Sequence, residues 1–228
     1  MSVRAEILGK IKNGLDAVES QDVRRQTAAA RLAAPPEHLV PARSQGDQET
    51  QTKLFIEMAE GVAASTARIP SLAGVPDAVA GYLARHNLPS RVRTDNDPLL
   101  ARIDWSSQAT LEVTSGPPTD GDQVSVTVAY GGVAETGTAV LTSGEDHPTT
   151  LNFLPETHII VLPLSRLRGT YEEVWESLRS DHDTGGDTLP RTVNWITGPS
   201  RTGDIEQTMQ LGIHGPQRLL VILVKDNG

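Results

Sequence analysis

The last long apolar run of the chain, residues 219–224, reads Leu-Leu-Val-Ile-Leu-Val and does not alternate with polar residues. A strand that is apolar on both faces belongs in the middle of a sheet that helices cover on each side. This run therefore predicts a buried central strand, and it restricts the chain to folds in which helices and strands share one core.

The rest of the pattern interleaves helices and strands. We expect strands rich in Val, Ile, Leu and Thr, and helices with one apolar face. This alternation predicts an α/β sandwich with a largely parallel sheet. The expected strands are 91–93, 109–113, 124–129, 137–141, 158–162, a strand ending at 196, and 219–224; the expected helices are 2–19, 48–64, 75–85, 170–178 and one beginning after Ser200.

The N-terminal segment differs in character from the rest of the chain. Residues 2–19 carry apolar side chains at helical spacing, including Ile7, Ile11 and Leu15, and a polar stretch with Pro35 and Pro36 comes after them. We interpret residues 1–34 as a helical arm with a linker and residues 35–228 as the α/β domain. The arm packs either on a partner or back on its own domain; the sequence leaves both open.

Composition excludes several classes of function. The formal charge is −9 and aromatic residues make up 4%, which argues against nucleic-acid binding. The chain has no cysteine, so it offers no disulfide, thiol nucleophile or thiolate-held iron–sulfur cluster. No apolar run approaches the roughly 20 residues that span a bilayer. The start of the chain lacks a signal-peptide pattern, so we expect a soluble, cytoplasmic protein.

The segment Ile196-Thr-Gly-Pro-Ser-Arg-Thr-Gly-Asp-Ile-Glu206 is the first candidate site. A strand ends at Ile196, and Ser200 is placed to cap a following helix, with Asp204 and Glu206 in its first turns. Arg201 adds a positive fork, and Thr202 follows it. Such a turn is typical of phosphate or carboxylate binding. The alternative is purely structural: breakers and a cap are needed at any strand-to-helix turn.

A glycine-rich stretch supplies the second candidate. Gly131 and Gly132 allow close backbone approach to a ligand, and Glu135, Thr136 and Gly137 follow them. Glu135 would serve as a nucleophile or general base. The alternative is a hairpin whose glutamate faces solvent. The dinucleotide spacing Gly-x-Gly-x-x-Gly is absent.

Three histidines complete the candidates. His158, at the start of a strand, is either a ligand or an ordinary hydrogen-bonded residue. His214 is expected at the end of the helix after Ser200, where a cation is favoured. His147 has the appearance of an exposed loop residue. No spacing of these residues is diagnostic of a metal site, so none is predicted.

In order, Glu135-Thr-Gly-Thr138, Leu154-Pro-x-x-His158, Thr197-Gly-Pro-Ser-Arg-Thr-x-Asp-Ile-Glu206 and Gly212-x-His-Gly-Pro216 resemble the LUD-domain family. The resemblance implies a three-layer fold similar to the sugar-phosphate isomerase and coenzyme A transferase superfamily. It also implies a role in oxidation of L-lactate to pyruvate beside two iron–sulfur partner proteins. Coenzyme A transferases use a glutamate nucleophile, for which Glu135 is the counterpart. Where many relatives carry a basic residue, this chain has His147.

We therefore expect an accessory or subunit protein of an L-lactate oxidation system that binds a small anionic ligand. Arg201 and Ser200 would hold the anion, with the loop from Gly131 to Gly137 closing over it. The alternatives are a stand-alone transferase or isomerase using Glu135, and a non-catalytic assembly protein that docks through its N-terminal helix. No motif identifies a cofactor.

Overall fold

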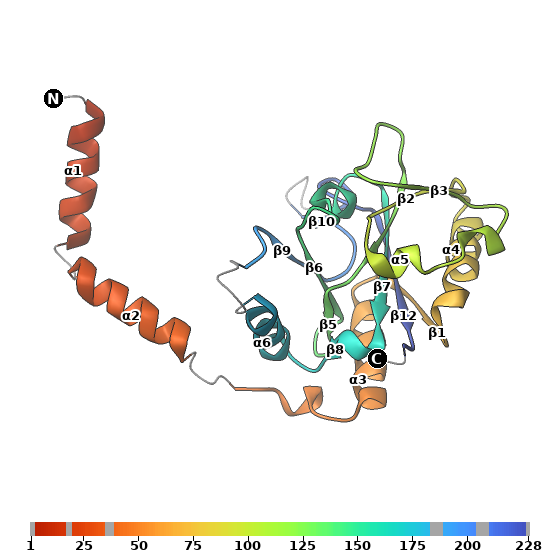
Figure 1. The fold of residues 1–228 in the computed structure, drawn as a ribbon, viewed down its shortest axis with the longest axis horizontal. Helices are drawn as coiled ribbons and strands as arrows, with labels where there is room; N and C mark the ends of the chain where they lie inside the picture. Colours follow the sequence, from red (N-terminus) through yellow and green to blue (C-terminus); the bar gives the residue numbers. More distant parts are fainter. Residues whose placement is uncertain (1–2, 17–19, 35–38, 183–188, 204–209, 227–228) are drawn as a thin grey trace. The chain divides into compact units, whose positions relative to one another are not determined.

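The computed structural model describes residues 3–16, 20–34, 39–182, 189–203 and 210–226 (Figure 1). Contacts divide the chain into two units, Met1–Val40 and Pro41–Gly228. The boundary expected from sequence, between residues 34 and 35, stays a prediction.

The N-terminal unit contains two helices, α1 (Val3–Asp16) and α2 (Gln21–Ala33). Ile7, Ile11 and Leu15 of α1 are each more than half exposed. The second helix corrects the sequence-based expectation of a polar linker here. Its start is marked by Ser20, whose side chain accepts a hydrogen bond from the backbone N–H of Val23.

The second unit is built on a six-stranded sheet in the order β1-β12-β7-β4-β2-β3, in which every neighbouring pair is parallel. The expected parallel sheet is confirmed. The expected strand 219–224 corresponds to β12, which lies between two neighbours. The strands are β1 (Ser65–Ile69), β2 (Arg91–Thr94), β3 (Glu112–Ser115), β4 (Val124–Val128), β7 (Thr157–Pro163) and β12 (Arg218–Val224).

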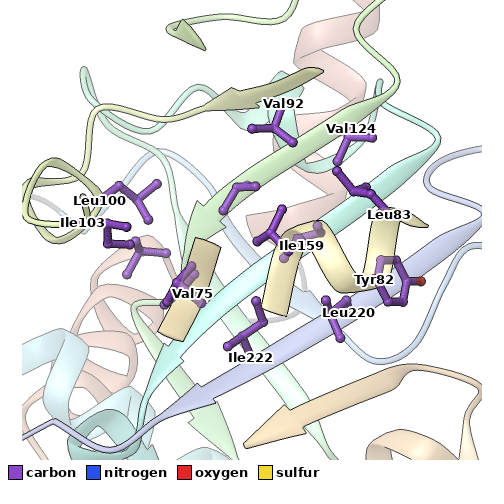
Figure 2. Close-up of a cluster of buried hydrophobic side chains, with 14 of the residues drawn as sticks. Val75, Tyr82, Leu83, Val92, Leu100, Ile103, Val124, Ile159, Leu220 and Ile222 are labelled. Carbon is purple, nitrogen blue, oxygen red and sulfur yellow. The ribbon is translucent and has the colours of Figure 1, made fainter. Parts of the chain in front are cut away.

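Both faces of this sheet are covered. On one face α4 (Val75–Arg85) and α5 (Pro98–Ala101) pack against alternate strand residues, among them Leu220 and Ile222 (Figure 2). On the other face Leu219, Val221 and Leu223 pack into a cluster that includes Phe55 of α3 (Gln48–Gly61). Consecutive residues of β12 therefore enter opposite cores, which is why the run is apolar throughout.

A four-stranded sheet shares the α3 side of the central sheet. Its order is β8-β5-β6-β9, from β5 (Gly131–Val133), β6 (Thr138–Thr142), β8 (Leu167–Arg168) and β9 (Val193–Ile196). Helix α6 (Tyr171–His182) packs against it through Val174 and Leu178. The strand ending at Ile196 thus belongs to this sheet, antiparallel to β6, and not to the parallel one.

The remaining elements are short. An antiparallel pair, β10 (Arg201–Thr202) and β11 (Gln210–Leu211), lies beyond β9. Turns of 3-10 helix cover Ala42–Ser44, Leu72–Gly74, Trp105–Ser107, Thr149–Asn152 and Leu164–Arg166. Together, α4 with α5, the central sheet, and α3 with the second sheet form the three layers of the expected sandwich.

Candidate functional site

A cavity of about 300 Å³ gathers four of the residues predicted from sequence: His158, Ser200, Arg201 and His214. We call it the amino-end cavity, because His158 and Leu219 are the second residues of the parallel strands β7 and β12. Its wall is formed by Asn152, Phe153, His158, Trp195, Ile196, Thr197, Gly198, Pro199, Ser200, Arg201, His214, Gly215, Pro216 and Leu219.

The backbone around Ser200 differs from the expected helix start. Strand β10 follows Ser200 at once, and its partner β11 lies ahead of a bend that contains His214. The N–H of Ser200 donates to the carbonyl of Pro216 at 2.9 Å, and its carbonyl accepts from Gly212 at 3.0 Å. These long-range bonds occupy the backbone groups that a helix would need. Among the described residues, neither Ser200 nor His214 therefore lies at the end of a helix; Asp204 and Glu206 lie outside the described residues.

Arg201 lines the cavity and also reaches the end of α3. Its guanidinium donates a hydrogen bond to the carbonyl of Val62, the residue that ends this helix. A cation is favoured at a helix C-terminus. A guanidinium has five N–H donors, so one bond holds the fork and leaves others for a ligand. Gly198 approaches the same carbonyl: its φ is +76° and an added Cβ would lie 2.6 Å from the Val62 oxygen.

His158 lies in the wall of the cavity and is fully buried. Its Nε2 is 2.7 Å from the hydroxyl oxygen of Thr127, whereas Nδ1 has no partner among the described residues. Burial lowers the pKa of His158 to about 3, so the ring is neutral near pH 7. A Thr127 hydroxyl that donates to Nε2 satisfies both groups and places the ring hydrogen on Nδ1.

The charge of the amino-end cavity has one sign. Arg201 and two histidines line it, and none of its described lining residues is an aspartate or glutamate. A site that holds a cation and no competing carboxylate suits an anionic ligand.

A second and larger cavity, of about 420 Å³, lies at the carboxyl ends of β2 and β4. We call it the carboxyl-end cleft. Asn152 lines both cavities, and the Thr127–His158 hydrogen bond joins a residue of each. The cleft is lined by Asp95, Asp97, Thr127, Val128, Tyr130, Gly131, Leu141, Thr142, His147, Pro148, Asn152, Arg166, Arg168, Val174, Ser177 and Asp181.

His147 lies between two aspartates of this cleft. Its Nδ1 is 3.1 Å from Oδ2 of Asp95, and its Nε2 is 3.8 Å from Oδ2 of Asp97. The hydrogen bond to Asp95, aided by the nearby negative charges, raises the pKa of His147 against the opposing effect of burial. His147 is therefore a half-buried member of a polar cluster, and not the exposed loop residue expected from sequence.

Sequence reasoning missed the aspartates and arginines of the cleft. A signal for the two aspartates was present, because Asp95 and Asp97 lie just past the end of the expected strand 91–93. Arg166 ends the 3-10 turn that follows β7, and its guanidinium donates to the carbonyl of Ala129 at 2.8 Å. Arg168 donates to the carbonyl of Ser165 at 2.7 Å.

The glycine-rich stretch does not form a loop over Arg201. Gly131 and Gly132 belong to the buried strand β5, and only Gly131 reaches a cavity, the carboxyl-end cleft. Gly132 is covered by Leu162: an added Cβ would lie 2.7 Å from a methyl carbon of that side chain. Gly137 has φ +64° and its Cα faces the backbone of α3.

Glu135 lies in the turn between β5 and β6 and is 7% exposed. It lines neither cavity. Thr136 beside it shares hydrogen bonds with the hydroxyls of Thr138 and Tyr171, at 2.7 and 3.0 Å. Thr202 is buried and also stays out of both cavities.

Two further properties concern metals and membranes. Within the described part of the chain, no group of three or more histidine, aspartate or glutamate side chains converges as metal ligands would. Across those same residues, no helix has the length and apolar character required to cross a membrane.

Residues 123–224 match the family model of the LUD domain, which confirms the resemblance carried by the motifs. Lactate utilization protein C of Geobacillus kaustophilus is 34% identical over 107 residues, which cover 46% of this chain and 44% of that protein. Lactate utilization protein C of Bacillus subtilis is 36% identical over 103 residues, or 45% and 42% of the two chains. The matches thus span less than half the length of these curated relatives.

One solved structure is similar in fold. The crystal structure of a DUF162 family protein from Deinococcus radiodurans superposes with a TM-score of 0.59 at 21% sequence identity. The superposition covers 79% of this chain and 99% of that one. At this identity the likeness concerns the fold, and it agrees with the three-layer sandwich.

Proposed function

We propose that this chain, which carries a LUD domain over residues 123–224, acts in lactate utilization as an accessory or subunit protein that binds a small anionic ligand in the amino-end cavity. The relatives that match this chain over about 45% of its length are named for lactate utilization. Every residue that lines the amino-end cavity lies between Asn152 and Leu219, inside the matched segment. The segment that matches the LUD family model therefore includes the whole wall of that cavity.

The observation that carries the proposal is a basic cavity without a lining carboxylate. Arg201 supplies a permanent charge and a planar fork that suits a carboxylate. With Thr127 donating to Nε2 of His158, the ring hydrogen would lie on Nδ1, which has no partner among the described residues; a buried donor without a partner costs about 1–3 kcal/mol. A ligand oxygen that accepted a hydrogen bond from Nδ1 would remove this cost. Ser200 and His214 add further polar groups at the wall.

The placement of Glu135 favours binding over covalent catalysis. A nucleophile must reach the bound substrate, and Glu135 lines neither cavity. A binding subunit fits this arrangement better than a stand-alone transferase. We further propose that residues 1–34 form a separate arm and that the partners are iron–sulfur lactate-utilization proteins, as the family resemblance implies.

The test replaces Arg201 by alanine in cells that depend on this protein for growth on L-lactate. We expect Arg201→Ala to slow growth on lactate, while growth on glucose is unchanged. The matched control is Arg102→Ala, which removes the same charge from an exposed position outside both cavities. In parallel, titration calorimetry with L-lactate and pyruvate is expected to show binding that weakens at least tenfold in Arg201→Ala.

Stability must be checked because Arg201 also bonds to Val62. The loss of that hydrogen bond is expected to lower the free energy of unfolding by about 0.5–1.5 kcal/mol, which leaves the domain folded. Equal growth of the Arg201→Ala and Arg102→Ala strains on lactate, with no binding of either acid by the wild-type protein, would refute the proposal.

A further inference from the structure

The carboxyl-end cleft lies where the order of the central sheet reverses. Strand β2 leads to β3 on one side of it, whereas its neighbour β4 leads to β7 on the other side. After β2 the chain enters α5, which packs in the core with α4. After β4 it enters β5, which belongs to the second sheet on the opposite face. Two loops that leave adjacent strand ends toward opposite faces open a crevice, and open α/β sheets bind ligands at such points.

We propose that the carboxyl-end cleft binds a ribonucleotide, with its phosphate against Arg166 and Arg168 and its ribose hydroxyls against Asp97. This site goes beyond the proposed function, since it differs from the amino-end cavity in position, charge and size. The assignment rests on two groups of charged side chains, here called the two ends of the cleft: Arg166 and Arg168 follow β7 and lie near Asp181, whereas Asp95 and Asp97 follow β2.

The cationic end is held in place before a ligand arrives. Arg166 donates to the carbonyl of Ala129 at 2.8 Å, and Arg168 donates to the carbonyl of Ser165 at 2.7 Å. Each bond fixes one nitrogen of a guanidinium and leaves other N–H groups for an incoming anion. Two fixed guanidinium forks are a typical arrangement for phosphate recognition.

The acidic end has a free acceptor. Oδ1 of Asp97 accepts from the N–H of Leu99 at 2.6 Å, whereas its Oδ2 is 3.8 Å from His147, beyond hydrogen-bond length. This oxygen can accept from a ligand hydroxyl. Asp95 is occupied instead, because it accepts from the N–H of Asp97 and contacts Nδ1 of His147. The raised pKa of His147 favours a positive ring that offsets part of the aspartate charge near an anionic ligand.

The size of the cleft favours a ligand larger than lactate. Its volume of about 420 Å³ exceeds the 300 Å³ of the amino-end cavity and lies in the usual range for organic-ligand pockets. Tyr130 lines the cleft, and its hydroxyl donates to Asp181 at 2.6 Å, which fixes an aromatic ring that a base can stack on.

Calorimetry on the full-length protein tests the proposal with AMP, GMP, CMP and UMP, each beside its nucleoside and its 2′,3′-dideoxynucleotide. We expect at least one monophosphate to bind at least tenfold more tightly than both of its analogues. Failure of all four monophosphates to bind at millimolar concentration would overturn the proposal. Binding of a nucleoside or a dideoxynucleotide as tight as that of its monophosphate would overturn it as well.

Variants assign the two ends of the ligand. Arg168→Gln is expected to bring the affinity ratio of monophosphate to nucleoside close to one. Asp97→Asn is expected to do the same for the ratio of ribose to dideoxyribose compounds. The matched control is Asp104→Asn: Asp104 also accepts a backbone N–H at the start of a short helix, but it lies outside the cleft. Ratios that change equally in Asp97→Asn and Asp104→Asn would contradict the assignment.

Discussion

Gly137 is a position at which a single added methyl group should lower the stability of the domain markedly. Its φ is +64°, and an added Cβ would overlap the backbone nitrogen of Ala59 and lie 2.7 Å from Cα of the same residue. Both atoms belong to the backbone of α3, so the helix would have to move by about 1 Å to restore a contact of 3.4 Å. Overpacking of this kind costs about 1–3 kcal/mol. The left-handed backbone adds about 1–2 kcal/mol for any residue with a Cβ.

The assay compares Gly137→Ala with Gly121→Ala by thermal and urea denaturation. Gly121 also has a positive φ, +93°, but nothing lies within 4 Å of its added Cβ. Both variants lose similar freedom in the unfolded chain, so their difference isolates the clash with α3. We expect Gly137→Ala to melt about 2–12 °C below Gly121→Ala, at roughly 2–4 °C per kcal/mol for a domain of this size. Equal melting temperatures would refute the argument that close packing on α3 requires glycine here.

Two further predictions concern titration and domain structure. The pKa of His147 is raised in the folded protein by its bond to Asp95, so its contribution to stability is complete below about pH 6.5 and is lost as the pH rises through the folded-state pKa. His147→Gln should therefore destabilise the protein more at about pH 6 than at about pH 9 in urea melts. A difference in unfolding free energy between variant and wild type that stays constant with pH would contradict this. Removal of residues 1–34 should leave the main thermal transition within about 4 °C, roughly 1 kcal/mol, of the full-length value, because contacts form separate units Met1–Val40 and Pro41–Gly228.

The parts of the fold that the sequence predicted are those with a strong hydrophobic period. The expected helix 75–85 has the bounds of α4, and the expected strands 124–129, 158–162 and 219–224 overlap β4, β7 and β12. These elements pack into the core, so they carry regularly spaced apolar side chains that can be recognised in the sequence. Strand β1 was missed because Ser65–Ile69 is a partly exposed edge strand with two polar residues and an arginine.

The helix start that was expected at Ser200, and that the structure replaces by β10, shows the limit of local signals. A serine after glycine and proline is a good cap, and nothing nearby contradicts a helix. The deciding bonds join Ser200 to Gly212 and Pro216, more than ten residues away. Secondary-structure propensity reflects neighbouring residues only, so it gives no sign of backbone pairing between residues this far apart. Residues that sequence reasoning chose for a helix-end site nevertheless converge, because the same pairing folds His214 back toward Ser200 and Arg201.

The candidate sites were predictable to different degrees. Motif residues from β7, the turn after β9 and the bend before β12 meet in the amino-end cavity, as the family resemblance suggested. The carboxyl-end cleft required the strand order, since Asp97 and Arg168 are brought together only by the reversal of the sheet. Glu135 appeared catalytic because carboxylates between glycines are rare; its surroundings show a turn packed beside α3.

The two cavities differ in how much of their wall lies inside the segment that matches the LUD family model. The amino-end cavity is built wholly from residues 152–219, inside the segment that the LUD match covers. The carboxyl-end cleft crosses the edge of that segment: Arg166, Arg168 and His147 lie inside it, whereas Asp95 and Asp97 lie before it. Substitutions in the loop after β2 can therefore retune one end of the cleft while the shared segment stays unchanged. Relatives that keep the same domain are therefore free to differ in the loop that forms this end of the cleft, and a common family name does not by itself imply a common ligand there.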